Sequence, residues 1–194
     1  MTSFTVIGHT ACTDASFSLD DLPGKGGRMD LLCRVVASSL FLSHGIREDT
    51  TCDIMLLGPP HPGRIIRFDG SALRSLSPDE RNVASAIKRA LAIPTGKTFR
   101  EAGPGLLTRK GTLADQLAEK HYAVLDESGT DIRKVASGDL PDAFLLSDNR
   151  NFTEDEMDSV RELPKYSLGP AIVHADHAIV LILNEIDRRR SGWN

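Results

Sequence analysis

Three polar residues near the end of the sequence, His174, Asp176 and His177, are of types that bind metals or transfer protons. Within one helical turn a His-x-Asp-His pattern does not place all three side chains on one face, because adjacent positions diverge by about 100°. We therefore favour polar lining at the start of a helix over a metal centre or an acid-base cluster. No metal ligand set is expected elsewhere.

The three cysteines do not predict a second chemistry. Cys12, Cys33 and Cys52 are too widely spaced for a Cys-x-x-Cys metal or redox pair. No nearby base or basic cluster would activate Cys33 or Cys52 as a nucleophile. The odd number and wide spacing of the cysteines fit a reduced cytosol, so we expect a cytoplasmic protein. No apolar run reaches membrane-spanning length, and the first residues predict a strand rather than a signal peptide, so no membrane partner is expected.

Two short segments each follow an apolar strand: LLSDN (residues 145–149) and SLGP (residues 167–170). In an open α/β sheet, ligands bind beyond the carboxyl ends of the strands, so small, turn-forming residues after two neighbouring strands mark a candidate pocket. Gly169 would allow the backbone to approach a ligand closely, and Pro170 would stiffen the turn.

Strands and helices alternate around this pocket. We predict strands at residues 4–11, 53–58, 64–70, 122–126, 143–147 and 165–168, and helices at residues 29–44, 77–91, 112–121, 153–163 and 174–190. The helix at Ser77 is marked by a capping box with Pro78 at the first helical position. This alternation predicts one α/β domain over residues 1–194, with a mostly parallel sheet covered by helices on both faces.

Positive charge gathers in one predicted irregular stretch, residues 88–110. It contains six cations against one anion, Glu101; the cations are Lys88, Arg89, Lys97, Arg100, Arg109 and Lys110. The net charge of −4 gives no global attraction to nucleic acid. A local cluster would still add salt-dependent attraction for phosphates, with a solvated loop as the alternative.

Six segments together resemble a known family. In chain order they are PGKGGRMDLLCR with FLSHGIR, LLGPP with RFDGS, SPDERN, LLSDN, and SLGP with HADHAIVLILNEIDR. They are similar to the archaeal tRNA pseudouridine-54 N1-methyltransferases of the SPOUT superfamily and their bacterial relatives. The resemblance implies a SPOUT-type α/β knot, with a C-terminal trefoil knot over roughly residues 140–190, and a homodimer.

The same resemblance implies the ligands. S-adenosylmethionine would bind in the knot, at Leu146, Leu168, Gly169, Ile172 and Ala178, and the substrate would be tRNA or another structured RNA. The sequence departs from the family pattern at two places, with Ala178 where a Cys is expected and Asn149 where a His often follows Asp148. Because cofactor contacts in this superfamily are largely main-chain, the Ala178 change should cost little.

Methyl transfer to N1 of pseudouridine requires alignment of nucleophile and methyl group and removal of one proton. We predict that Asp30 is the base or orienting group for the N1–H, and that Arg28 lies near a phosphate or the O2 carbonyl. Asp30 has the residue type of a helix N-cap, which is the equally weighted alternative. No metal is needed for this chemistry.

Five cations are predicted to contact the RNA: Lys25, Arg64, Arg67, Arg81 and Arg100. For Arg64, Arg67 and Arg81 the alternative is an ordinary ion pair with a nearby carboxylate. Two other functions stay open at this point. One is a SPOUT methyltransferase for a different RNA site, and the other is a catalytically silent RNA-binding protein.

Overall fold

The computed structural model describes residues 1–193. Its strands are β1 (Thr2–Gly8), β2 (Phe41–Leu42), β3 (Gly45–Ile46), β4 (Thr50–Leu56), β5 (Arg64–Asp69), β6 (Arg100–Gly103), β7 (Leu106–Lys110), β8 (Tyr122–Asp131), β9 (Ala143–Ser147) and β10 (Lys165–Ser167). Its α-helices are α1 (Met29–Leu40), α2 (Glu80–Ala92), α3 (Leu113–Leu117), α4 (Glu154–Ser159) and α5 (Ala175–Ser191). Two short 3-10 helices, η1 (Ile132–Lys134) and η2 (Ser137–Asp139), follow β8.

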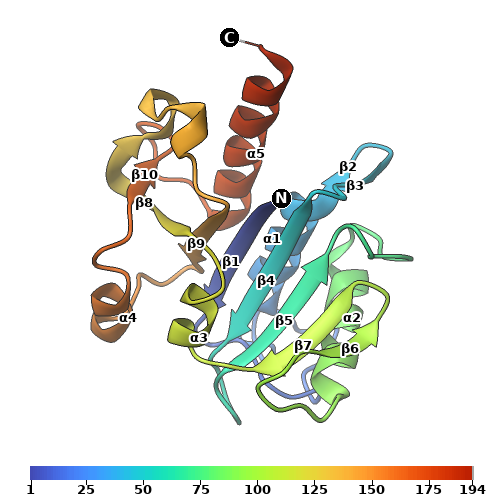
Figure 1. Ribbon diagram of the computed structural model, residues 1–194. Coiled ribbons are helices and arrows are strands. Elements are labelled where there is room, and N and C mark those ends of the chain that lie inside the picture. The colour runs from blue at the N-terminus through green and yellow to red at the C-terminus, as the bar shows by residue number, and fades with distance from the viewer. Residues whose placement is uncertain (194) are drawn as a thin grey trace.

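Eight strands form one sheet in the order β10-β8-β9-β1-β4-β5-β7-β6 (Figure 1). The pairings from β10 through β4 are parallel, as predicted. The pairings from β4 through β6 are antiparallel, which the sequence analysis did not predict. The sheet therefore has a parallel half and an antiparallel half that share β4.

The prediction of an irregular stretch at residues 88–110 was wrong. This stretch holds the last turn of α2 and the hairpin β6–β7. The hairpin turn contains Gly105, whose φ of 69° lies in the left-handed region that glycine adopts without strain. Leu106 and Thr108 are buried on one face of β7; on the other face Leu107 is partly exposed, whereas Arg109 is buried as well.

Helices cover both faces of the sheet, as predicted. Phe4, Val6 and Phe144 pack with α1, α2 and α5 in the larger core cluster, whereas Ile7 and Leu145 pack with α3 and the α4 region in the smaller one. This division follows from the strand repeat, because successive side chains point to opposite faces. The rings of Phe4 and Phe144 stack with their centroids 5.8 Å apart.

Several predicted bounds shift. Helix α1 ends at Leu40 rather than at residue 44, because the following residues pair as the β2–β3 hairpin. Helix α2 begins at Glu80, with Asp79 rather than Ser77 as the N-cap; the Asp79 carboxylate accepts a hydrogen bond from the Asn82 N–H at 2.8 Å. Strand β8 continues the predicted strand at residues 122–126 as far as Asp131, and the two 3-10 helices, which were not predicted, follow it before β9.

Helix α5 packs against α1 on the larger core (Figure 1). Ile179, Ile182 and Leu183 are buried, and Asp187 forms an ion pair with Arg47 at 2.6 Å. The C-terminal helix is thus an integral part of the core. Among residues 1–193 there is no helix with the length and apolar character needed to cross a membrane.

Candidate active site

A cavity of about 600 Å³ lies beyond the carboxyl end of β9 and beside residues 125–127 in the middle of β8. Leu146, Ile172 and Ala178 line it. An adjoining hollow of about 80 Å³ is lined by Leu168 and Gly169 together with Ile172 and Ala178. The structure therefore brings together, around the two adjoining hollows, all five residues that the sequence analysis assigned to the cofactor, from three separate segments of the chain.

Gly169 lines the smaller hollow. Its φ is 151°, a conformation that other residues rarely adopt, and no atom lies within 4 Å of the position that a Cβ would take. Space beside a bare backbone is what a ligand held by main-chain groups requires. Beside it, Ile172 is 78% exposed, an unusual position for a large apolar side chain in the absence of a partner.

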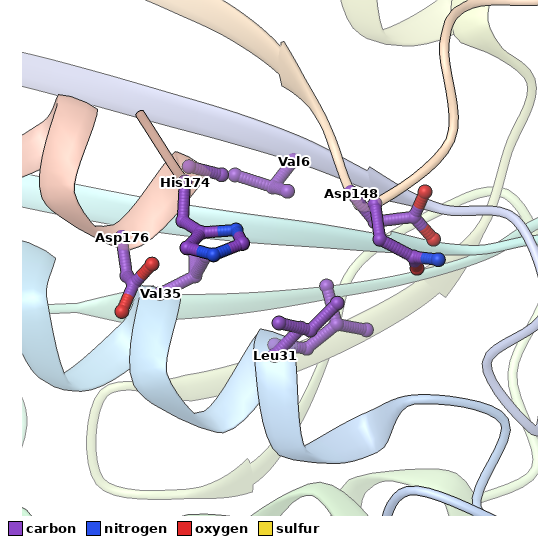
Figure 2. A pocket seen from close by; sticks show the side chains of 9 residues that line it. Val6, Leu31, Val35, Asp148, His174 and Asp176 are labelled. Atoms are coloured by element: carbon purple, nitrogen blue, oxygen red, sulfur yellow. The ribbon is translucent and has the colours of Figure 1, made fainter. Parts of the chain in front are cut away.

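A small crevice adjoins the cavity between α1 and the start of α5 (Figure 2). Figure 2 shows His174 and Asp176 at one end of it and Asp148 at the other, with Leu31 of α1 alongside. Four lining residues are common to crevice and cavity: Asp148, Asn149, His174 and Ala175. The two hollows therefore share one wall, and Asn149, whose role the resemblance left open, is part of it.

The expected polar lining at the start of α5 is present. His174 is the N-cap residue of α5, and Asp176 is buried in its first turn, whereas the side chain of His177 is 65% exposed. Among residues 1–193 no group of three His, Cys, Asp or Glu side chains is arranged to hold a metal ion.

The buried cysteines are not activated nucleophiles. Burial raises the pKa of Cys52 to about 12, and burial likewise holds the pKa of Cys33 well above its usual range.

Arg28 and Asp30 lie together at the start of α1. Arg28 has left-handed backbone angles (φ 66°, ψ 31°), and its guanidinium donates to both carboxylate oxygens of Asp30, at 3.0 and 3.1 Å. Arg34 also donates to Asp30, at 3.3 Å. The N-cap alternative for Asp30 was wrong, because Asp30 is inside the helix and Arg28, which takes the cap position, makes no side-chain cap hydrogen bond.

These contacts decide what Asp30 can do. Burial acts to raise the pKa of Asp30, but Arg28 and Arg34 outweigh it and hold the pKa below the ordinary value. A carboxylate in that state is a weak base. Asp30 is therefore better suited to orienting Arg28 than to removing a proton.

Arg34 links this pair to the crevice. Its Nε lies 3.6 Å from a carboxylate oxygen of Asp176, while its Nη1 binds Asp30 and Glu80. Within residues 1–193 the Asp176 carboxylate makes no hydrogen bond, and the imidazole Nε2 of His177 lies 3.9 Å from it. Asp176 thus lines the crevice with oxygens that can still accept a proton or a hydrogen bond.

Two of the predicted RNA contacts need correction. Arg64 is buried: it donates to Thr108 Oγ1 at 2.8 Å and to the carbonyls of Ala90 and Ile93 at the end of α2. Arg67 donates to both oxygens of Asp53, at 2.8 and 2.7 Å, and pairs with a second carboxylate. Both guanidinium groups are bound by partners within the protein, which favours the structural alternative over contact with RNA.

The other three predicted RNA contacts are accessible. Lys25 and Arg100 are exposed, and Arg81 forms an exposed ion pair with Asp20, which is of the kind that contributes little to stability. Their contact with RNA remains a prediction.

His9 was missed by the sequence analysis. It directly follows β1, and Asp148 directly follows β9, the parallel neighbour of β1. Its Nδ1 lies 2.9 Å from Asp148 Oδ1, and its Nε2 lies 3.0 Å from Glu156 Oε2. Polar residues just beyond two adjacent parallel strands were the available signal, since those strand ends meet at one sheet edge.

The comparisons with known proteins cover the whole chain. A family model described as "Putative SAM-dependent RNA methyltransferase" matches residues 1–191. A tRNA (pseudouridine(54)-N(1))-methyltransferase of Methanospirillum hungatei is 91% identical, with 100% of each chain covered. One of Methanocorpusculum labreanum is 49% identical over 97% of this chain and 98% of its own.

A solved structure, the Nep1 protein of Archaeoglobus fulgidus bound to S-adenosylhomocysteine, has the same fold. It superposes with a TM-score of 0.65 over 98% of this chain and 99% of its own, at 14% sequence identity. The sequence resemblance is therefore confirmed at the level of family and of fold. This chain belongs to the family of S-adenosylmethionine-dependent RNA methyltransferases.

Proposed function

We propose that this protein transfers the methyl group of S-adenosylmethionine to N1 of pseudouridine 54 in the T-loop of tRNA. The geometry that carries the proposal is the wall shared by the cavity and the crevice. A donor in the cavity and a base beside the crevice would meet at Asp148 and Asn149. High identity over the full length to enzymes of that name supports the choice of substrate.

The cavity suits the donor. Its volume of about 600 Å³ falls within the range of small-molecule sites, about 300–1,000 Å³. The open backbone at Gly169 and the apolar side chains of Leu146, Leu168 and Ile172 would hold an adenosine moiety. When bound, S-adenosylmethionine supplies an electrophilic methyl group on a positively charged sulfur.

Arg28 and Asp30 would position the acceptor. The guanidinium of Arg28 is partly exposed, and Asp30 fixes it from one side with two hydrogen bonds. Its remaining N–H groups can fork onto the O2 carbonyl of the base or onto a phosphate. Orientation of this kind reduces the entropy that must be lost at the transition state.

Asp176 would take the proton. As N1 forms its bond to the methyl carbon, the carbon–sulfur bond breaks with its electron pair left on sulfur, and the N1 proton must leave. Asp176 lines the crevice and, within residues 1–193, has no hydrogen bond of its own, whereas Asp30 has three. We therefore assign the proton to Asp176 and the orienting role to Asp30.

A homodimer, a trefoil knot over roughly residues 140–190 and a cytoplasmic location belong to the same proposal. Helix α5 exposes Val180 and Leu181, which are 50% and 45% accessible, on the side away from the core. Apolar surface at that place would suit a second copy of the chain. Light scattering coupled to gel filtration should give twice the mass of the chain, and Val180→Glu should shift it to monomer.

The decisive experiment uses labelled S-adenosylmethionine and tRNA transcripts that carry either uridine or pseudouridine at position 54. Label should appear only on the pseudouridine transcript. Nucleoside analysis should then recover the label as N1-methylpseudouridine. Equal labelling of the uridine transcript would point to another RNA site. Donor binding without labelling of either transcript would indicate a silent RNA-binding protein.

A further inference from the structure

His9 holds together two segments that are distant along the chain. Its ring has 8% side-chain exposure, and its backbone N–H donates to Asp148 Oδ2 at 2.9 Å while Nδ1 meets Asp148 Oδ1 at the same distance. On the other side, Nε2 lies 3.0 Å from Glu156 Oε2. One imidazole thus bridges the residue after β9 and the first turn of α4.

Both carboxylates are also committed to the backbone. Asp148 Oδ1 accepts from the Arg150 N–H at 2.9 Å, and the Asp148 N–H donates to the carbonyl of Ile7 at 3.0 Å. Glu156 Oε2 accepts from the Thr153 N–H at 2.8 Å as part of a capping box. The bridge therefore fixes the backbone at both ends of residues 148–156 as well as the side chains.

Those residues form a side of the donor cavity. Asp148, Asn149, Arg150, Asn151, Phe152 and Met157 line it, and each lies within the bridged segment or directly beside it. The bridge closes the segment into a loop whose position depends on His9. The site geometry, including the wall shared with the crevice, is then set by a residue that lines neither hollow.

We propose that His9 is a positioning residue that clamps residues 148–156 against the end of β1 and so sets the affinity of the protein for its methyl donor. The proposal rests on donor binding in the cavity assigned above. It does not depend on which RNA is methylated.

The clamp needs a proton. An imidazole can donate to two carboxylates at once only when both ring nitrogens carry hydrogen, that is, as the cation. The groups that act on it are Asp148, after β9, and Glu156, in α4, while Arg28, at the start of α1, acts on Asp148. The hydrogen bond to Asp148, opposed by burial and aided by Glu156, raises the pKa of His9 above its ordinary value of 6.5.

The raised pKa of His9 determines how donor affinity should change with pH. Because the pKa of His9 is raised in the folded protein, the clamp is complete at and below the ordinary value and is lost as the pH rises through the raised value. Loss of the proton leaves one of the two carboxylates facing a ring nitrogen that no longer donates, so one of the two imidazole links of the clamp is broken. Donor affinity should therefore fall as the pH rises.

The test measures the Kd of S-adenosylhomocysteine by titration calorimetry between about pH 6 and pH 9, for the full-length protein. His9→Gln should weaken binding about tenfold at the low end, the effect of a lost charged hydrogen bond, and should flatten the pH dependence. His44→Gln, a change of the same kind at an exposed hairpin turn, should match the wild type. Comparison between variants cancels the titration of the ligand itself.

Glu156→Gln provides a second test if His9→Gln does not fold. Its amide oxygen can still accept from Thr153, but the negative charge beside His9 is gone, so the loss of affinity should begin at a lower pH than in the wild type. Parallel curves for wild type, His9→Gln and Glu156→Gln would overturn the proposal, as would absence of binding by the wild type. Binding with the expected pH dependence but no methylation of pseudouridine would instead remove only the proposed function.

Discussion

The two halves of the sheet differ in whether their charged side chains are paired within the protein. In the antiparallel half, buried Asp53 pairs with Arg67, Arg67 and Arg109 share Glu119, and the ring of Phe99 lies 4.4 and 4.8 Å from the two guanidinium carbons. At the carboxyl edge of the parallel half, Asp176 and the exposed part of Arg28 keep free bonding capacity beside a cavity. A count of cations along the sequence does not distinguish these situations, although only the second can act on a ligand.

Among the variants considered, replacement of Asp53 should have the largest effect, a loss of stability in the antiparallel half. Asp53 is 1% exposed, so Asp53→Ala leaves the guanidinium of Arg67 partly unpaired in a buried site and should cost about 3–5 kcal/mol of unfolding free energy. Urea denaturation measures this. Asp20→Ala, which removes the exposed partner of Arg81, should change stability by less than about 1 kcal/mol. Weaker donor binding by folded Asp53→Ala would show that the antiparallel half contributes to the site.

Asp176→Asn tests the carboxyl edge of the parallel half. The amide keeps the shape of the side chain but cannot take a proton, so kcat should fall about 100-fold, or about 2.7 kcal/mol in transition-state stabilisation. Stability and the Kd for S-adenosylhomocysteine should stay close to the wild type. Glu80→Gln is the matched control, since Glu80 is also a partner of Arg34 but does not line the crevice. Equal loss of kcat in both variants would make Arg34, rather than Asp176, the group that matters.

The sequence predicted the parallel half well because local patterns and long-range pairing agree there. Apolar strands ending in LLSDN and SLGP located the cavity correctly, and the family resemblance supplied its five lining residues. The antiparallel half was harder. Arg64 and Arg67 are cations on a strand, and only the partner strand and the end of α2 determine that they are buried.

His9 was missed for a related reason. Its partners are Asp148 and Glu156, about 140 residues further along the chain, and the predicted strand at residues 4–11 included His9, so its position just beyond β1 was not recognised. The N-cap alternative for Asp30 likewise failed on a single backbone detail. Arg28 adopts the left-handed conformation and takes the cap position, which the residue type does not predict.

Arg64→Met would sharpen the contrast within the set of predicted RNA contacts. The variant loses the hydrogen bonds to Thr108 and to the last carbonyls of α2, and should lose about 1–3 kcal/mol of stability. Because the guanidinium is buried, affinity for tRNA should not change. Filter binding at two salt concentrations, on protein that thermal melting shows to be folded, checks both statements. A weakened complex would restore Arg64 as an RNA contact.

Arg100→Ala should give the smallest effect, and it should change the affinity for RNA rather than the stability. Arg100 is exposed on edge strand β6, where its one side-chain hydrogen bond among residues 1–193 is to the carbonyl of Pro94, at 3.2 Å. Stability should therefore change by less than about 0.5 kcal/mol. If the edge of the antiparallel half meets tRNA, the Kd should rise about threefold and the slope of log Kd against log salt should fall by about one, because one phosphate contact is lost. An unchanged salt slope would confine RNA binding to the parallel edge, near Lys25 and Arg28, and the antiparallel half would then serve only to support the sheet.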